Sequence, residues 1–217
     1  MEALCQQAAP EAALLLQSDL IDHTVQIHGA ATRGMVNGGI KPLLHPIVQA
    51  TADALSGATD RLTSDDLARR RRPDRWSVAE ILDHLLKTYA STAYILNRCV
   101  EKGTPKGRRA TLRERLTSWI VLGLERFPTG VLTPEVAVPS PHPRSTVRGD
   151  ALTALALFDV AATAAQQRFG ARTKLANHPV LGPFDADQWR KFHLVHTRHH
   201  MKQITRLLRA GAGALRD

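Results

Sequence analysis

Helical periodicity is the feature that most constrains this fold, because four segments repeat apolar residues at the three- and four-residue spacing of one helix face. These segments span residues 46–60, 77–103, 150–169 and 185–211. Almost no stretch shows the alternation typical of a strand. Amphipathic helices bury their apolar stripes against one another, and 217 residues are enough for one such core. The sequence therefore predicts an all-α protein, a four-helix bundle.

Two of the helix starts carry strong local signals. In a capping box, the N-cap side chain and the side chain three positions later each accept a hydrogen bond from the other residue's backbone, and a hydrophobic staple often flanks the box. The predicted boxes are Ser77 with Glu80 and Asp185 with Gln188, and the staples are Trp76 with Ile81 and Phe184 with Trp189. Glycines at the far ends predict that these helices stop at Gly103 and Gly211, and that the third stops at Gly170.

Residues 104–147 differ from the rest of the chain. A helix is predicted over residues 112–124, and five prolines follow between positions 128 and 143. Prolines this closely spaced fit neither a helix nor a central strand. We therefore expect a long, partly helical, Pro-rich crossover between the second and third bundle helices. A shorter helical turn is expected over residues 65–70.

The first 40 residues mix Ala, Gln and Gly without a sustained period. We interpret residues 1–40 as a weakly ordered extension and residues 41–217 as the bundle domain. No run approaches the roughly 20 apolar residues of a membrane span. Two cysteines cannot build a disulfide framework, so we expect a reducing, cytoplasmic location.

Four of the ten histidines lie within residues 193–200, which calls for a chemical explanation. On a helix that turns about 100° per residue, His193, His196 and His200 share the stripe that must face the core, whereas His199 points to the flank. Imidazoles four positions apart, as in His196 and His200, can converge on one cation. A third ligand must then come from another helix.

The alternative is that these are ordinary core histidines with satisfied hydrogen bonds, which is the usual explanation for a single buried histidine. Three imidazoles without a shared partner would leave ring nitrogens unpaired at about 1–3 kcal/mol each, whereas a metal ion satisfies one nitrogen of each. Periodicity alone leaves both explanations open. Thr197 follows His196, so the catalytic Glu of the H-E-x-x-H metalloproteases is absent and that activity is not expected.

Residues 75–85 (RWSVAEILDHL) and 196–204 (HTRHHMKQI) resemble the two signature stretches of the DinB/YfiT-like superfamily. Its members are four-helix bundles that hold a divalent metal with three histidines, and some are bacterial thiol transferases or isomerases. The resemblance covers roughly residues 43–210 and implies the ligands His84, His196 and His200. The Pro-rich segment at 128–147 departs from the commoner pattern, so no substrate class carries over.

Two further side chains are candidates for orienting these ligands. For His193, a hydrogen-bonding partner of a ligand, an extra ligand and an ordinary core residue all remain open; the orienting role is favoured because metal-bound imidazoles need such partners. Gln203 is the other candidate, although a buried Gln on a helix is more often a packing contact.

The formal net charge of +9 raises the question of a nucleic-acid partner. The densest basic run, residues 69–72, lies near a helix C-terminus, where cations are favoured whether or not they bind anything. No nucleic-acid-binding motif is present and aromatic residues make up only 5% of the chain, so nucleic acid is not expected. Four arginines beside the crossover are instead candidates for lining the route of an anionic ligand to the metal: Arg108, Arg109, Arg113 and Arg115.

Cysteine usage predicts a cytoplasmic protein, and the resemblance implies a bacterial metal-dependent enzyme. Its three-histidine site would activate a small thiol or water for thiol transfer or for hydrolysis of a small substrate. The alternative is a metal-binding protein without turnover. Zn²⁺ is the first choice of metal, with Ni²⁺ or Fe²⁺ as alternatives. We expect a small-molecule substrate as partner and neither nucleic acid nor a membrane, and we leave a homodimer open.

Overall fold

The computed structural model describes residues 43–127 and 133–213, with side chains described to residue 209. The elements below belong to a compact unit that begins at Leu44. The weakly ordered extension predicted for residues 1–40 lies outside the described residues. Within the described ranges, no helix combines the length and the apolar composition that crossing a membrane requires.

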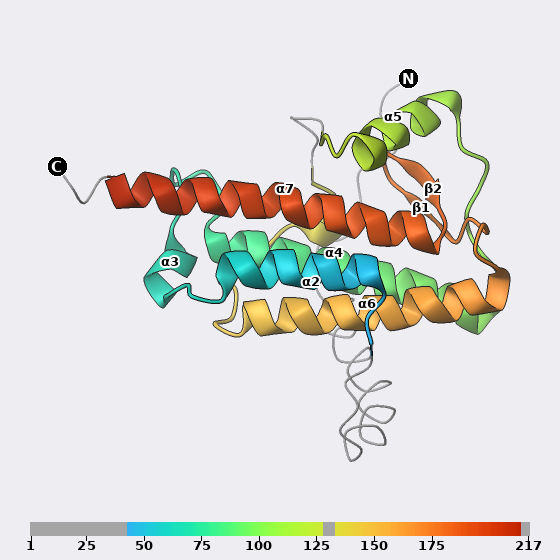
Figure 1. Ribbon diagram of the computed structural model, residues 1–217, viewed down its shortest axis with the longest axis horizontal. Helices are drawn as coiled ribbons and strands as arrows, with labels where there is room; N and C mark the ends of the chain where they lie inside the picture. The colour runs from blue at the N-terminus through green and yellow to red at the C-terminus, as the bar shows by residue number, and fades with distance from the viewer. Residues whose placement is uncertain (1–42, 128–132, 214–217) are drawn as a thin grey trace, which may run out of the picture. The chain divides into compact units, whose positions relative to one another are not determined.

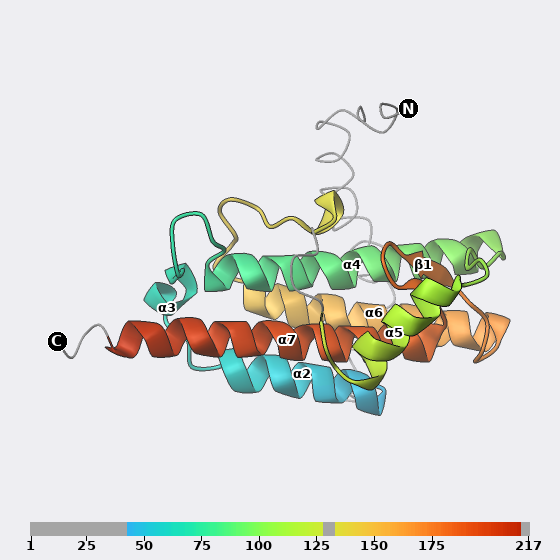
Figure 2. The same ribbon diagram turned by 90° about the horizontal axis from the view of Figure 1, so that it is seen from above.

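Four long helices form the bundle, and they lie side by side in both views (Figures 1 and 2). They are α2 (Pro46–Thr59), α4 (Val78–Lys102), α6 (Val147–Phe169) and α7 (Ala186–Gly213). Helices α2 and α7 run in one direction, and α4 and α6 run in the other. Because α4 and α6 are parallel, the chain needs a long crossover to return to the end where α6 begins. The prediction of an all-α four-helix bundle is confirmed.

Smaller elements lie around the four bundle helices. Helix α3 (Ser64–Ala68) lies at one end of it, and α5 (Leu112–Gly123) lies near the start of α7 (Figure 1). A short 3-10 helix, η2 (Glu135–Ala137), interrupts the Pro-rich segment and packs against α4. The antiparallel strands β1 (Ala176–His178) and β2 (Gly182–Phe184) precede α7. This hairpin was not predicted, because three-residue strands are too short to show an alternating pattern.

The predicted helix starts at Ser77 and Asp185 are confirmed. The Ser77 hydroxyl accepts from the Glu80 amide while the Glu80 carboxylate accepts from the Ser77 amide. Asp185 and Gln188 exchange the equivalent bonds at 3.0 and 3.2 Å. At the other end of α4, Gly103 adopts the left-handed conformation (φ 65°) that ends a helix without strain.

Three predicted helix boundaries differ from the structure by two residues or more. Helix α3 ends at Ala68 instead of residue 70. Helix α6 begins at Val147, three residues before the predicted start, because the Val147 side chain is buried and joins the core. Helix α7 continues to Gly213 instead of ending at Gly211. A glycine inside a helix costs only about 1 kcal/mol and does not by itself end the helix.

The pairing of α4 with α6 is the most extensive helix pairing in the bundle, and alanines recur among the buried residues of both helices. Ala90 and Ala93 on α4 and Ala154, Ala161 and Ala165 on α6 are all buried. Alanine lets two helix backbones approach closely and costs little side-chain entropy. The second main pairing, between α2 and α7, completes the core.

A buried arginine ties α7 to its neighbours. The Arg190 side chain is 1% exposed and its Nε donates to Asp159 Oδ1 on α6 at 3.2 Å. Its other nitrogens donate to Thr163, Gln166 and Asp187. The second oxygen of Asp159 accepts from the His45 amide, just before α2. One ionic network therefore joins α2, α6 and α7.

Candidate metal centre

Helices α4 and α7 carry the three histidines implied as metal ligands. His84 lies seven residues, about two turns, after the Ser77 N-cap of α4. His196 and His200 lie about one turn apart on α7. The three side chains are buried, with residue exposures of 6%, 7% and 7%. The bundle thus brings His84 next to side chains more than 100 positions away in the sequence.

The three imidazoles face one another through the same ring atom. His196 Nε2 lies 3.2 Å from His84 Nε2 and 3.0 Å from His200 Nε2. Nitrogens bound at 2.0–2.1 Å to one tetrahedral ion would be about 3.3 Å apart. The cluster therefore fits a metal-binding site, and ring nitrogens of all three residues lie within 4.8 Å of one another.

Hydrogen bonds on the far side of two rings set which nitrogen carries the proton. His84 Nδ1 donates to the Ala137 carbonyl at 2.7 Å, and His200 Nδ1 donates to Gln203 Oε1 at 3.0 Å. In a neutral imidazole the other nitrogen, Nε2, then presents a lone pair. This is the arrangement in which a backbone carbonyl or side chain orients a metal-binding histidine.

Hydrogen bonds among the three rings cannot satisfy all of their nitrogen atoms. The lone pairs of His84 and His200 both point toward His196 Nε2, which can donate to only one of them. His196 Nδ1 is itself buried without a hydrogen-bond partner among the described residues. A single cation at the common point would accept all three lone pairs at once, so the donor set suits a divalent metal that prefers imidazole.

Burial keeps these histidines neutral. Desolvation, followed by the neighbouring His200 and His84, lowers the pKa of His196 well below 6.5. Desolvation also lowers the pKa of His200, to about 3, and that of His84. Metal ions bind the deprotonated imidazole, so near neutral pH no proton needs to be displaced before binding.

The Pro-rich crossover holds the carbonyl that orients His84. The Ser140 amide donates to Asp83 Oδ2 at 2.6 Å, and Lys87 Nζ donates to the Val138 carbonyl at 2.7 Å. Asp83 and Lys87 also pair with each other at 3.3 Å. Asp83 and Lys87, neighbours of His84 on α4, thus hold the segment that follows η2 against this helix. The sequence reasoning missed Ala137, because a backbone carbonyl has no signature in the sequence.

Aromatic rings wall the cluster. The Trp76 ring lies 5.1 Å from the His84 ring, between centroids, and the Phe127 and Phe192 rings lie 5.3 and 5.2 Å from that of His196. Trp76 was predicted only as a helix staple. Apolar walls around a polar centre reduce access of water and strengthen electrostatic interactions inside.

The remaining candidate residues take different positions. Gln203 contacts His200, whereas His193 makes no hydrogen bond to any of the three clustered histidines and packs among the rings of Tyr89, Phe158 and Trp189. His199 is exposed on the flank of α7, as expected from its helical angle.

We expect His193 to make the metal-free protein sensitive to acid. Burial, with a smaller effect of His178, lowers the pKa of His193 to about 3 in the folded protein, against 6.5 for the unperturbed side chain. The unfolded chain binds the extra proton between these values, so the free energy of unfolding falls as pH drops from 6.5 toward 3. The loss is about 2 kcal/mol at pH 5. Urea unfolding across this pH range should show a shallower decline of the free energy of unfolding for His193→Leu than for the unchanged protein. An equal decline in the two proteins would contradict the lowered pKa of His193.

Comparison with known proteins places these residues in a family context. A family model described as the DinB superfamily matches residues 47–204, from the first turn of α2 to the last turns of α7. The matched range includes all three clustered histidines. No curated protein and no solved structure matches the chain.

Proposed function

Because this chain belongs to the DinB superfamily, and its bundle buries three converging imidazoles, we propose that it binds a divalent transition metal through His84, His196 and His200. We further propose that the bound metal activates a small thiol or water for thiol transfer or hydrolysis of a small substrate. Zn²⁺ is the first choice, and Ni²⁺ or Fe²⁺ are alternatives with the same preference for imidazole.

The observation that carries this proposal is the pair of Nε2 contacts at 3.0 and 3.2 Å between neutral rings. Two of the rings have their protons held on Nδ1 by Ala137 and Gln203, so their lone pairs point inward. A cluster of core histidines serving only to pack would need no such orientation.

The chemistry follows from the number and charge of the ligands. Three protein ligands leave at least one position open, which distinguishes a catalytic from a closed structural site. Such a metal acts as a Lewis acid that lowers the pKa of a thiol or water placed in the open position. Neutral imidazoles do not offset the positive charge of the metal, so the site favours an anionic fourth ligand such as a thiolate.

The chain has no thiol close to the cluster within its described residues. Cys99 lies 15 residues after His84 on α4, about 22 Å along the helix, and its buried thiol donates to the Leu175 carbonyl. Cys5 lies outside the described residues. We propose that the thiol that reacts at this site comes from solution. The partly buried rings of Trp76 and Phe127 would contact the apolar part of the substrate.

A cobalt-substituted protein provides the test. We expect a small thiol, from a panel of bacillithiol, mycothiol, glutathione and cysteine, to shift the visible absorption of the cobalt form at millimolar concentration. The shift should strengthen as pH rises toward the thiol's own pKa, about 8.5, and should be absent in His200→Ala.

Two other outcomes are informative. If no thiol changes the spectrum but cobalt still binds, thiol transfer is wrong, and hydrolysis or metal binding without turnover takes its place. If the protein does not bind cobalt at all, the metal assignment itself fails.

A further inference from the structure

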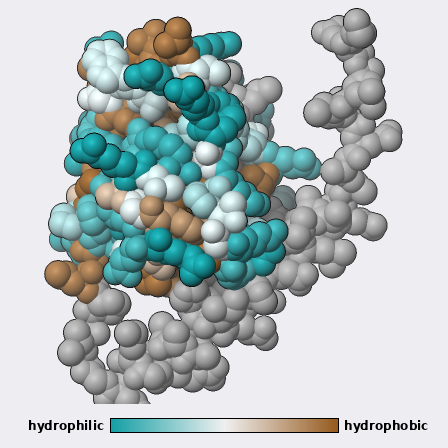
Figure 3. All heavy atoms as spheres, turned by 90° about the vertical axis from the view of Figure 1, so that its right-hand side faces the viewer, coloured by the Kyte–Doolittle hydropathy of each residue, from teal (hydrophilic) through white to brown (hydrophobic). Residues whose placement is uncertain are grey.

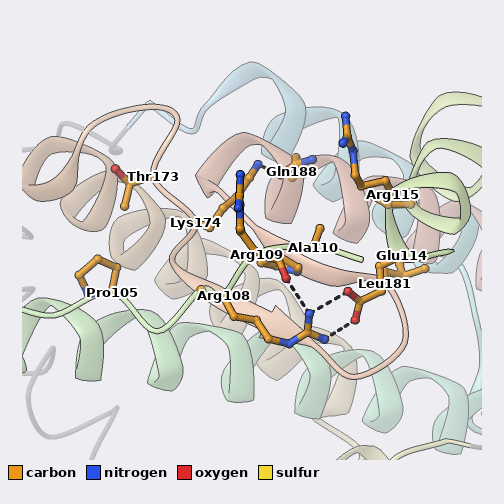
Figure 4. A pocket seen from close by; sticks show the side chains of 13 residues that line it. Pro105, Arg108, Arg109, Ala110, Glu114, Arg115, Thr173, Lys174, Leu181 and Gln188 are labelled. Atoms are coloured by element: carbon orange, nitrogen blue, oxygen red, sulfur yellow. Dashed lines mark hydrogen bonds and ion pairs between the residues drawn. The ribbon is translucent and has the colours of Figure 1, made fainter. Parts of the chain in front are cut away.

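A pocket outside the histidine cluster lies at the end of the bundle where α7 begins. Its volume is about 690 Å³, within the range of sites for small molecules. The walls come from the loop before α5, from α5 itself, from the hairpin and from Gln188 in the first turn of α7 (Figure 4). Figure 3 views the molecule from this end and shows a mostly hydrophilic face with separate hydrophobic clusters.

Positive charge dominates this pocket. Its lining includes Arg108, Arg109, Arg115 and Lys174, against one carboxylate, that of Glu114. Arg108 pairs with Glu114, and the two side chains point toward each other in Figure 4. The same carboxylate also accepts from the Thr111 amide, so its charge is already engaged.

Lys174, Arg109 and Arg115 differ in whether a residue of the chain already pairs with their charge. Lys174 Nζ is held by Asp185 at 2.6 Å and also contacts Gln188. Arg109 and Arg115 have no ion pair within the described residues, and their side chains extend away from the Arg108–Glu114 pair in Figure 4. Two guanidinium groups without a carboxylate partner thus border one hollow, which favours an anionic ligand.

Close backbone contacts make the walls rigid. The Gly107 amide donates to the Lys174 carbonyl at 3.1 Å, and the Asn177 side chain bonds the backbone on both sides of Gly107. A Cβ at Gly107 would lie 2.2 Å from the Lys174 carbonyl oxygen, so only glycine fits there. A Cβ at Gly182 would lie 2.9 Å from the Glu114 side chain, and Gly182 has a positive φ of 82°. The backbone of the loop that carries Arg108 and Arg109 is therefore held in place before any ligand binds.

This pocket is separate from the histidine cluster. Gln188 precedes His196 by eight residues and His200 by twelve on the same helix, which places the pocket about 12–18 Å away along the axis. None of the three clustered histidines lines this pocket, so it forms a site apart from the expected route of an anionic ligand to the metal. Arg113, grouped with the pocket's arginines on sequence grounds, is not part of the lining.

We propose that this pocket binds a small organic anion that carries a phosphate or carboxylate group. Arg109 and Arg115 bind the anionic group, with the anchored Lys174 beside them. Pro105, Leu181 and Pro183 offer an apolar surface to the body of the ligand. Planar guanidinium groups suit both phosphate and carboxylate because each offers paired oxygens to a bidentate donor. The site does not depend on the metal.

Titration with phenyl phosphate, inorganic phosphate, benzoate and phenol tests this proposal. We expect phenyl phosphate to bind more tightly than inorganic phosphate, and neutral phenol not to bind, by isothermal titration calorimetry of the full chain at low salt. Amide shifts in NMR spectra should centre on Gly107, Ala110 and Lys174. Benzoate distinguishes a carboxylate site from one specific for phosphate.

Matched variants decide the outcome. Arg109→Ala and Arg115→Ala should each weaken binding by about tenfold or more. Arg113 is an exposed arginine on α5, the helix that carries Arg115, and Arg113→Ala should leave the affinity unchanged. Binding must persist in His200→Ala, which separates this site from the metal centre. Three results would each overturn the proposal. They are no binding at a ligand concentration of about 10 mM, about ten times the dissociation constant of a millimolar site, an equal loss of affinity in Arg113→Ala, and amide shifts centred on residues 69–72.

Discussion

Replacing His84, His196 or His200 with alanine should each remove most of the bound metal. Each of these rings supplies one of three converging nitrogens, and three ligands are already the minimum for a tightly bound catalytic ion. The loss of affinity should exceed the roughly 10–100-fold that follows from losing an orienting partner. Elemental analysis of protein purified without a polyhistidine tag, combined with competition against a chelator, gives both occupancy and affinity.

The chain offers two graded controls for this experiment. His199→Ala changes the same residue type on the same helix, but His199 is exposed and lies outside the cluster, so metal content should not change. Gln203→Ala removes only the partner of His200 Nδ1 and should weaken affinity by about 10–100-fold without abolishing binding. A His196→Ala protein that retains full metal content while remaining folded by circular dichroism would contradict the ligand assignment.

Replacing Arg190 with alanine should cost about 3–5 kcal/mol of the free energy of unfolding. The substitution leaves Asp159 buried without its cation, and it also removes the donor to Gln166 and Thr163. Breaking one half of a buried ion pair is more damaging than losing the pair, because the remaining charge keeps its desolvation penalty. Urea unfolding followed by circular dichroism measures the change.

The neighbouring Lys191 is the matched control. It pairs with Glu125, but both side chains are about one-third exposed, so Lys191→Ala should cost no more than about 1 kcal/mol. A double variant, Arg190→Met with Asp159→Leu, should be less destabilised than the sum of the two single variants, since no charge then remains buried. Equal effects of Arg190→Ala and Lys191→Ala would show that the Arg190 network contributes little.

Two of the three clustered histidines follow from local sequence. His196 and His200 must share a face because a helix repeats every 3.6 residues, whatever the rest of the fold does. His84 is different, because periodicity gives its angle on its own helix but not which residue of another helix it will meet. Only the resemblance to a family links it to the other two, and the bundle places its Nε2 atom 3.2 Å from that of His196.

The roles of His193 and Gln203 show the same limit. On the helical wheel both lay near the stripe of the ligands, and the orienting role was favoured for His193. The folded chain places aromatic rings around His193 and turns the Gln203 amide to His200. A difference of a few ångströms separates a hydrogen bond from a packing contact, and that difference depends on the neighbouring helices.

Local sequence determined the helices of this protein, because each signal acts between residues three or four positions apart. Ser77 and Asp185 cap their helices with hydrogen bonds to the fourth residue of the same segment. The tertiary structure alone decided that the crossover places the Ala137 carbonyl on His84, and that Gly107 and Gly182 build an arginine-lined pocket beside α7. These contacts involve backbone atoms that meet residues far away in the sequence. Every residue has nearly the same backbone atoms, so the sequence gives no sign of which carbonyl or amide will meet which distant residue.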